Sequence, residues 1–135
     1  MRYVTGVFVC YISRPLSGRL SAAGVHGITV HGTTGEPMFL SRAERLAVIK
    51  TVRKALDDVQ SSCVMVVGCG VPSLWETKEL IAEAAKAGAD FVMVIPPSTF
   101  AKAMTDDILY DFYKEVRERR GERARALVQS GIDSS

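Results

Sequence analysis

The sequence predicts an α/β fold with a parallel sheet, and two observations carry this prediction. First, three short apolar runs are continuous along the chain, which is typical of strands whose two faces are both covered by helices. These runs are Ile28–Val30, Val64–Val67 and Phe91–Ile95. Second, each run is followed by a loop and a predicted helix start, at Ser41, Ser73 and Thr105, each 32 residues after the last (73 − 41 and 105 − 73). A strand–loop–helix unit repeated at one period is typical of a barrel or solenoid-like architecture.

The N-terminal part of the chain is less regular than these units. Tyr3–Ile12 is rich in β-forming residues and predicts a strand, which the segment Arg14–Gly18 ends. Arg19–Ala23 predicts a short helix closed by Gly24, because glycine is the usual residue just past a helix C-terminus. The stretch between this strand and Ile28 is short for a complete crossover helix. We therefore expect part of the first strand–helix unit to be missing.

The helices that follow have clear start signals and one apolar face each. Ser41 with Glu44, and Ser73 with Glu76, predict capping boxes in which each side chain bonds the other residue's amide. The predicted inward residues are Leu46, Ile49, Val52, Leu56 and Val59 in the first helix and Leu74, Ile81, Ala84 and Ala85 in the second, which Gly88 ends. The predicted solvent face of the first helix carries Arg45, Lys50, Arg53 and Lys54. The third helix starts at Thr105-Asp106-Asp107 and presents Ile108, Leu109, Phe112 and Val116 on one face.

Composition predicts one globular domain and excludes two classes of partner. The chain has 135 residues, of which 47% are hydrophobic and 24% charged, and we assign residues 1–135 to a single domain. A net charge of +2 is too small to favour nucleic acid, and the basic residues of Lys114–Arg125 alternate with glutamates as on a solvated helix face. No apolar stretch approaches the length of a membrane span. We expect neither a nucleic-acid nor a membrane partner.

Three cysteines, Cys10, Cys63 and Cys69, lie in or beside apolar runs. Their odd number and their placement predict reduced, buried thiols and a cytoplasmic location. A zinc site would need closer spacing of cysteines with histidines than His26 and His31 provide. The sequence therefore predicts no metal site, and no cofactor is expected.

The loop after the first apolar run is the candidate functional site. Gly32 and Gly35 allow backbone conformations closed to other residues and a close approach of backbone amides to a ligand. Thr33 and Thr34 add two hydroxyls that both donate and accept hydrogen bonds. Such a pocket suits a small anion, most simply a carboxylate, and it lacks the features of a phosphate-binding or dinucleotide-binding loop. The alternative interpretation is that Gly-Thr-Thr-Gly is only a tight turn.

Four motifs follow one another along the chain in a fixed order. They are Gly32-Thr33-Thr34-Gly35-Glu36 with Leu40-Ser41 and Glu44-Arg45, then Gly68-Cys69-Gly70 with Ser73 and Glu76-Thr77, then Ala87-Gly88-Ala89-Asp90, and last Val94-Ile95-Pro96-Pro97-Ser98. In this order they resemble the dihydrodipicolinate synthase / N-acetylneuraminate lyase family of class I aldolases. The resemblance covers residues 20–116. Each motif alone is weak, but the four in register make a specific signal.

The resemblance implies a fold, a reaction and roles for the loop. The fold is a (β/α)8 TIM barrel, of which this chain would form roughly the first four βα units. The reaction condenses or cleaves pyruvate or a related 2-oxo acid through a lysine Schiff base. In the family the first threonine of the motif belongs to a hydroxyl relay and the second binds the substrate carboxylate. The resemblance thus assigns Thr33 as catalytic, and Thr34, Gly32 and Gly35 as substrate-binding.

The chain departs from the family in length and at both ends. A complete barrel needs about 250 residues, roughly twice the length of this chain. The family's tyrosine, in a Tyr-Asn-x-Pro run, and its Schiff-base lysine come from later strands and have no counterpart here. Ser98-Thr99-Phe100 stand where the family has an aromatic pair with a phenol, residues 1–19 and 117–135 are atypical, and no strand is expected after Val116. We therefore expect no lyase turnover from this polypeptide.

Two other interpretations stay open. The chain is a non-catalytic half-barrel that binds a small carboxylate or a protein partner, or forms a homo-oligomer through its open sheet edges, because unpaired strands invite association. Alternatively, it is a translated remnant that folds poorly, because a half-closed sheet exposes apolar strand faces.

Single residues near the loop have plain structural interpretations. His31 is expected to be a satisfied core histidine and not a group facing a barrel lumen. Glu36 is expected to hold the loop by accepting amide hydrogens, and Trp75 is expected to serve packing. Gly68 and Gly70 are expected to permit a tight turn beneath the site.

Overall fold

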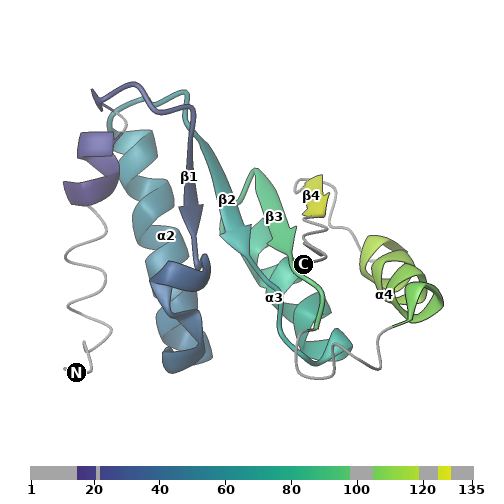
Figure 1. Ribbon diagram of the computed structural model, residues 1–135. Helices are drawn as coiled ribbons and strands as arrows, with labels where there is room; N and C mark the ends of the chain where they lie inside the picture. Colours follow the sequence, from purple (N-terminus) through teal and green to yellow (C-terminus); the bar gives the residue numbers. More distant parts are fainter. Residues whose placement is uncertain (1–14, 21, 98–104, 119–124, 129–135) are drawn as a thin grey trace.

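Four parallel strands form the sheet on which the described part of the chain is built (Figure 1). The computed structural model describes residues 15–20, 22–97, 105–118 and 125–128. The strands are β1 (Gly27–Val30), β2 (Val64–Gly68), β3 (Phe91–Val94) and β4 (Arg125–Val128), and they lie side by side in chain order. All neighbours pair in parallel, with Gly27 opposite Val64 and Val66 opposite Phe91. The parallel α/β prediction is confirmed, and whether these strands belong to a closed barrel stays a prediction.

Helices connect the strands as the repeat predicts. They are α2 (Arg42–Asp58), α3 (Leu74–Lys86) and α4 (Asp106–Glu118), and residues 15–20 are also helical. The Ser41–Glu44 capping box is complete, with the Ser41 amide donating to the Glu44 carboxylate over 2.8 Å. At α3 only half of the predicted box forms, because Ser73 accepts from the Glu76 amide and no return bond is present. The helix starts at Ser41 and Ser73 are therefore confirmed.

The core lies between the sheet and its helices, and it covers one face of the sheet. Met65, Val67, Val92 and Val94 are almost fully buried and pack in one cluster with Leu56 of α2. The intervening strand residues are half-buried or exposed, and this alternation shows that helices cover only one sheet face. The prediction that both faces are covered is wrong, because a continuous apolar run does not by itself tell which faces helices reach. We call the other face the open face; its apolar side chains are Val64, Val66, Phe91, Met93 and Ile95, and β1 adds Gly27 and Thr29 to it.

The predicted ends of the chain differ from the structure. Strand β4 pairs in parallel with β3, Arg125 opposite Phe91 and Val128 opposite Val94, so the expectation that no strand follows Val116 is wrong. The four residues Arg-Ala-Leu-Val are too short and too close to charges to stand out in the sequence, but the free edge of β3 supplies their hydrogen bonds. The first described residues, 15–20, are already helical, upstream of the predicted start at Arg19, and Gly24 follows with φ +80° as expected. The predicted strand Tyr3–Ile12 lies outside the described residues.

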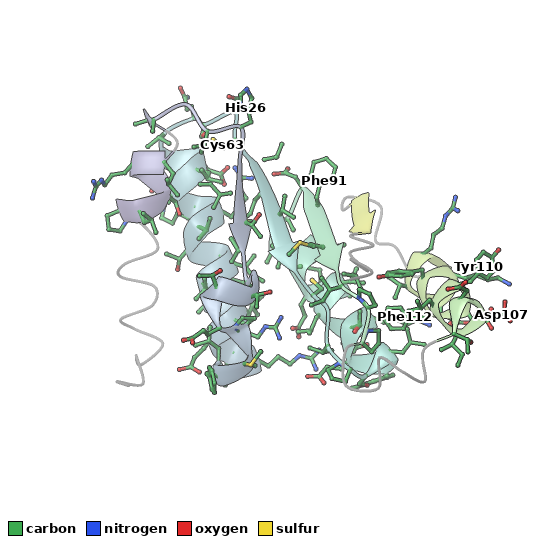
Figure 2. The ribbon with its side chains drawn as sticks, in the orientation of Figure 1. His26, Cys63, Phe91, Asp107, Tyr110 and Phe112 are labelled. Atoms are coloured by element: carbon green, nitrogen blue, oxygen red, sulfur yellow. The ribbon has the colours of Figure 1, made fainter. Side chains whose placement is uncertain are left out.

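Three predicted core contacts are absent. Val59 is the C-cap of α2 and is 54% exposed, because the helix ends before this residue can turn inward. Ile108 lies in the first turn of α4 and Trp75 in the first turn of α3, and both point into solvent instead of packing. Phe112 is buried and makes an edge-on ring contact with Tyr113, while Tyr110 lies on the outer side of the same helix (Figure 2). Among the described residues, no helix is both long and apolar enough to span a bilayer.

Candidate functional site

The candidate loop joins the carboxyl end of β1 to α2 through two short 3-10 turns. Thr33–Gly35 forms the first turn and Pro37–Phe39 the second. The amide of Gly35 donates to the Gly32 carbonyl over 2.8 Å, and the amide of Glu36 donates to the Thr33 carbonyl over 3.1 Å. Both amides are therefore used inside the loop. In a parallel α/β sheet this edge is where ligands bind.

Left-handed backbone occurs on either side of the two glycines, and not at them. His31 has φ 62° and Glu36 has φ 47°, whereas Gly32 has φ −66°. The prediction that the glycines supply conformations closed to other residues is therefore wrong. A side chain at Gly35 would meet nothing within 4 Å, and one at Gly32 would touch only Thr29 at 3.5 Å. The glycines leave open space above the loop.

The two threonines are exposed, as a ligand-binding role requires. Thr33, Thr34 and Gly35 all lie at the surface, and neither hydroxyl bonds another residue in the described part of the chain. Glu36 is exposed too and contributes its backbone amide to the turn, but its carboxylate accepts no hydrogen bond from the described residues. The expectation that the Glu36 carboxylate holds the loop is therefore wrong.

Beneath the loop, the ends of β1 and β2 are in direct contact. A Cβ atom at Gly68 would lie 2.1 Å from the carbonyl oxygen of His31, so only glycine allows these two backbones to meet. A Cβ atom at Gly70 would lie 2.9 Å from the amide of Ile95, which brings the end of β3 to the same edge. Gly68 and Gly70 thus permit close approach between strand ends and not the tight turn that was predicted.

A cluster of buried polar side chains lies next to this contact. Together with apolar residues of α2 and α3, this cluster lines a small cavity of about 10 Å³. Its members are His31, Arg45 and Cys69. Arg45 Nη2 donates to the Gly68 carbonyl over 3.0 Å, while Arg45 Nε and both ring nitrogens of His31 have no partner among the described residues. His31 is buried as predicted, but it is not the satisfied histidine that was expected. Arg45 was predicted to face solvent and is instead 9% exposed.

Burial sets the protonation of this cluster. It lowers the pKa of His31 to about 4, with the Arg45 charge as a second cause, so the imidazole is neutral near pH 7. It raises the pKa of Cys69 to about 12, so the thiol does not ionise. Burial also lowers the pKa of Arg45, but an arginine keeps its proton in proteins. The cluster carries one positive charge.

The second histidine, His26, and the second cysteine that the structure describes, Cys63, lie at the opposite end of the sheet. His26 and Cys63 sit near the amino ends of β1 and β2 (Figure 2), and the Cys63 thiol donates to the Val25 carbonyl over 2.7 Å. A cleft of about 560 Å³ opens there, and its lining among the described residues includes no carboxylate, lysine or arginine. In the described part of the chain, no three histidine, cysteine or acidic side chains are grouped so as to hold a metal ion.

Sequence reasoning missed Arg45 as a member of the site region. Arg45 stands three and four residues before Val48 and Ile49, so helical spacing places it on the buried face of α2. Its charge led to the prediction of a solvent-facing side chain, and the spacing is the signal that could have found it. The segment Ser98-Thr99-Phe100 lies outside the described residues.

The chain is similar to a known family and to proteins of known structure. Residues 19–123 match the family model described as the Dihydrodipicolinate synthetase family. The chain is 40% identical over 100 residues to "Probable 4-hydroxy-2-oxoglutarate aldolase, mitochondrial" of Emericella nidulans, covering 73% of this chain and 32% of that protein. It is 40% identical over 114 residues to the N-acetylneuraminate lyase of Homo sapiens, covering 84% of this chain and 32% of that protein. The chain therefore spans about a third of the length of these relatives.

Among solved structures, dihydrodipicolinate synthase from Cyanidioschyzon merolae with lysine bound superposes with a TM-score of 0.79. The match covers 88% of this chain and 38% of that protein, at 21% sequence identity. A likeness at this identity shows a common fold, in which the described α/β units have their counterpart.

Proposed function

The chain belongs to the dihydrodipicolinate synthetase family, and from this premise we propose that it carries the carboxylate-binding part of a pyruvate-type lyase or aldolase site. The observation that carries the proposal is the exposed Thr33-Thr34 pair at the carboxyl end of β1, with both hydroxyls unbonded among the described residues. In this proposal Thr34 binds the carboxylate of a small 2-oxo acid such as pyruvate. Gly32 and Gly35 leave room for the ligand, and Thr33 passes protons as part of a hydroxyl relay.

The imine-forming lysine would come from outside the described strands. None of the four strands contains a lysine. The lysines that the structure describes lie on helices, at Lys50, Lys54, Lys78, Lys86 and Lys114. An amine nucleophile needs a desolvated position that lowers its pKa, and four of these five are exposed. We propose that the 135-residue polypeptide binds a 2-oxo acid without turning it over.

Two measurements on the chain test this proposal. Pyruvate is titrated into the ¹⁵N-labelled protein, and the amide resonances of Thr33 and Thr34 are followed by NMR. Thr34→Val keeps the shape of the side chain and removes its hydroxyl, so we expect affinity for pyruvate to fall by roughly ten-fold. Thr51→Val, which removes a hydroxyl that bonds the Ala47 carbonyl within α2, is the matched control. Unchanged affinity in Thr34→Val would contradict the assignment.

Borohydride reduction in the presence of pyruvate tests the second half of the proposal. We expect no mass increase on any lysine, because none of the lysines that the structure describes lies on a strand, where an imine-forming amine would be desolvated. A stable lysine adduct would show that the chain forms the Schiff base by itself.

A second candidate function is a non-catalytic half-barrel that self-associates. The observation that favours it is the open face, which is apolar and contributes nothing to the helix-side core. In the described part of the chain β1 pairs only with β2, and β4 only with β3, so both outer edges are available for strands of another copy. Two sheets of four strands would supply the eight strands of a barrel.

We place the protein in a reducing compartment such as the cytoplasm. Cys63 and Cys69 are free, buried thiols, and Cys69 is 1% exposed. Buried free thiols are usual where disulfides are kept reduced.

A further inference from the structure

Arg45 is a buried cation without an ionic partner. Its side chain is 9% exposed, its Nη2 donates to the Gly68 carbonyl over 3.0 Å, and its Nε has no partner among the described residues. Two other arginines of the helices form ion pairs. Arg42 bonds Glu79 and Glu83, and Arg53 bonds Asp57 and Asp90. Arg45 has no carboxylate within ion-pair distance in the described part of the chain.

The carboxylates near Arg45 compensate its charge only from a distance: Glu76 and Glu83 favour the charged guanidinium, but neither forms an ion pair with it in the described part of the chain. His31 and Cys69, which line the same cavity, are both neutral near pH 7 for the reasons given above. Glu83 also lines the cavity, but its carboxylate already accepts a bond of 2.9 Å from Arg42 Nε. A buried unpaired charge is costly, and its field is weakly screened by solvent and salt.

The Arg45 charge lies next to the strand end from which the candidate loop starts. His31 lines the cavity with Arg45, and Thr33 follows His31 by two residues, so the Cα atoms of His31 and Thr33 are at most about 7.6 Å apart. The loop itself, residues 32–36, contains no cation, and its only charge is the carboxylate of Glu36, which repels an anion. A carboxylate bound at this loop therefore needs positive charge from elsewhere.

We infer that Arg45 supplies the positive field that holds the carboxylate of the ligand at the Gly32–Gly35 loop, without touching the ligand. This inference rests on the proposed function and names a positioning residue for it. The hydrogen bond to Gly68 fixes the guanidinium at the end of β2, and the neutral His31 lines the same cavity. The burial that makes Arg45 costly to fold is what keeps its field strong at the loop.

The test compares a charged ligand with a neutral one of the same shape. Pyruvate and pyruvamide are titrated into wild-type protein, Arg45→Met, Arg45→Lys and the control Lys50→Met, which removes an exposed charge from the same helix, with the Thr33 and Thr34 amides followed by NMR. We expect Arg45→Met to bind pyruvate roughly ten-fold more weakly, because the field of one unit charge is lost, and to bind pyruvamide as wild type does. Arg45→Lys should recover most of the pyruvate affinity, and Lys50→Met should change neither ligand.

Each other outcome has a definite meaning. Equal weakening of both ligands in Arg45→Met would show a structural role and overturn the inference, as would unchanged pyruvate binding. If wild-type protein binds neither ligand, the proposed function itself fails. If Arg45→Met does not fold, the Arg45 Nε–H resonance of wild-type protein provides the test: it should shift with pyruvate and not with pyruvamide, and the absence of that difference would overturn the inference.

Discussion

At the scale of single residues, His31 combines three unfavourable features at one position. It has a left-handed backbone at φ 62°, it is 8% exposed, and neither ring nitrogen has a partner in the described part of the chain. Such features cost free energy and persist where the surrounding structure holds them in place. Here the close contact of the His31 carbonyl with Gly68 and the buried Arg45 provide that constraint.

The neutral imidazole of His31 makes stability depend on pH. Because its pKa is about 4 in the folded state and near 6.5 when exposed, the unfolded chain binds the extra proton between these values. Above the higher pKa, His31 is neutral in both states and the folded state keeps its full stability. As the pH falls toward the lower pKa, the unfolded state is favoured because it binds the proton. His31 should therefore lower the free energy of unfolding by about 2 kcal/mol between about pH 7 and about pH 5, measured by urea denaturation.

His31→Asn is the variant that isolates this effect. Asparagine tolerates positive φ and does not titrate, so the variant should show a shallower pH dependence than wild type. His26→Asn makes the same change at the exposed histidine and serves as the matched control. Equal slopes for wild type and His31→Asn would show that the imidazole is not held neutral by the fold.

At the scale of elements, the two capped helices differ in the hydrogen bonds that the glutamate of the first turn accepts from the capping serine. At α2 the Glu44 carboxylate accepts hydrogen bonds from the Ser41 amide and hydroxyl, while at α3 the Ser73 hydroxyl accepts from the Glu76 amide and Glu76 makes no return bond. Glu44→Ala should therefore cost about 1 kcal/mol of stability, and Glu76→Ala clearly less. Both variants lose a carboxylate from a helix first turn, so the dipole contribution is shared. Equal losses in urea denaturation would contradict a role for the return bond.

Short sequence patterns predicted these elements correctly where the interactions behind the pattern are the ones that form the element. The capping serines fix the starts of α2 and α3, and the apolar runs fix β1 to β3, because both effects act within a few residues. The missed features depend on contacts across the fold. Strand β4 exists beside the free edge of β3, and the buried face of α2 accommodates the charged Arg45 because the Gly68 carbonyl accepts a hydrogen bond from it.

The features of the candidate loop also fall into those that the sequence predicts and those that depend on the folded structure. Its position after β1 and the exposure of Thr33 and Thr34 follow from the strand–loop–helix order, which the sequence displays. The use of left-handed backbone at His31 and Glu36, and not at the glycines, does not follow from composition. It depends on the path that the loop takes from the end of β1 to Ser41, and the packing of the fold determines this path.

At the scale of the whole molecule, the two faces of the sheet differ: the described helices cover one face and leave the open face uncovered. The helix-side face is buried in a single core, while the open face presents Val64 at 37% exposure and Ile95 at 42%. Apolar strand faces in contact with water favour association. The two outer strands run in the same direction and are unpaired on their outer sides among the described residues, so a second copy can pair with both edges at once.

Association through the open face can be tested with one charge placed on it. Met93 lies on the open face in β3, half-buried and next in register to Gly68, so Met93→Lys would place an ammonium group inside any closed pair of sheets. We expect wild-type protein to form dimers by light scattering and Met93→Lys to dissociate at least about ten-fold more readily, because burying an unpaired charge is costly. Met38→Lys makes the same change at a site 75% exposed in the loop before α2 and should dimerise as wild type does. A wild-type monomer at all concentrations, or equal behaviour of the two lysine variants, would show that the open face does not join two copies and would leave carboxylate binding at Thr34 as the function of the chain.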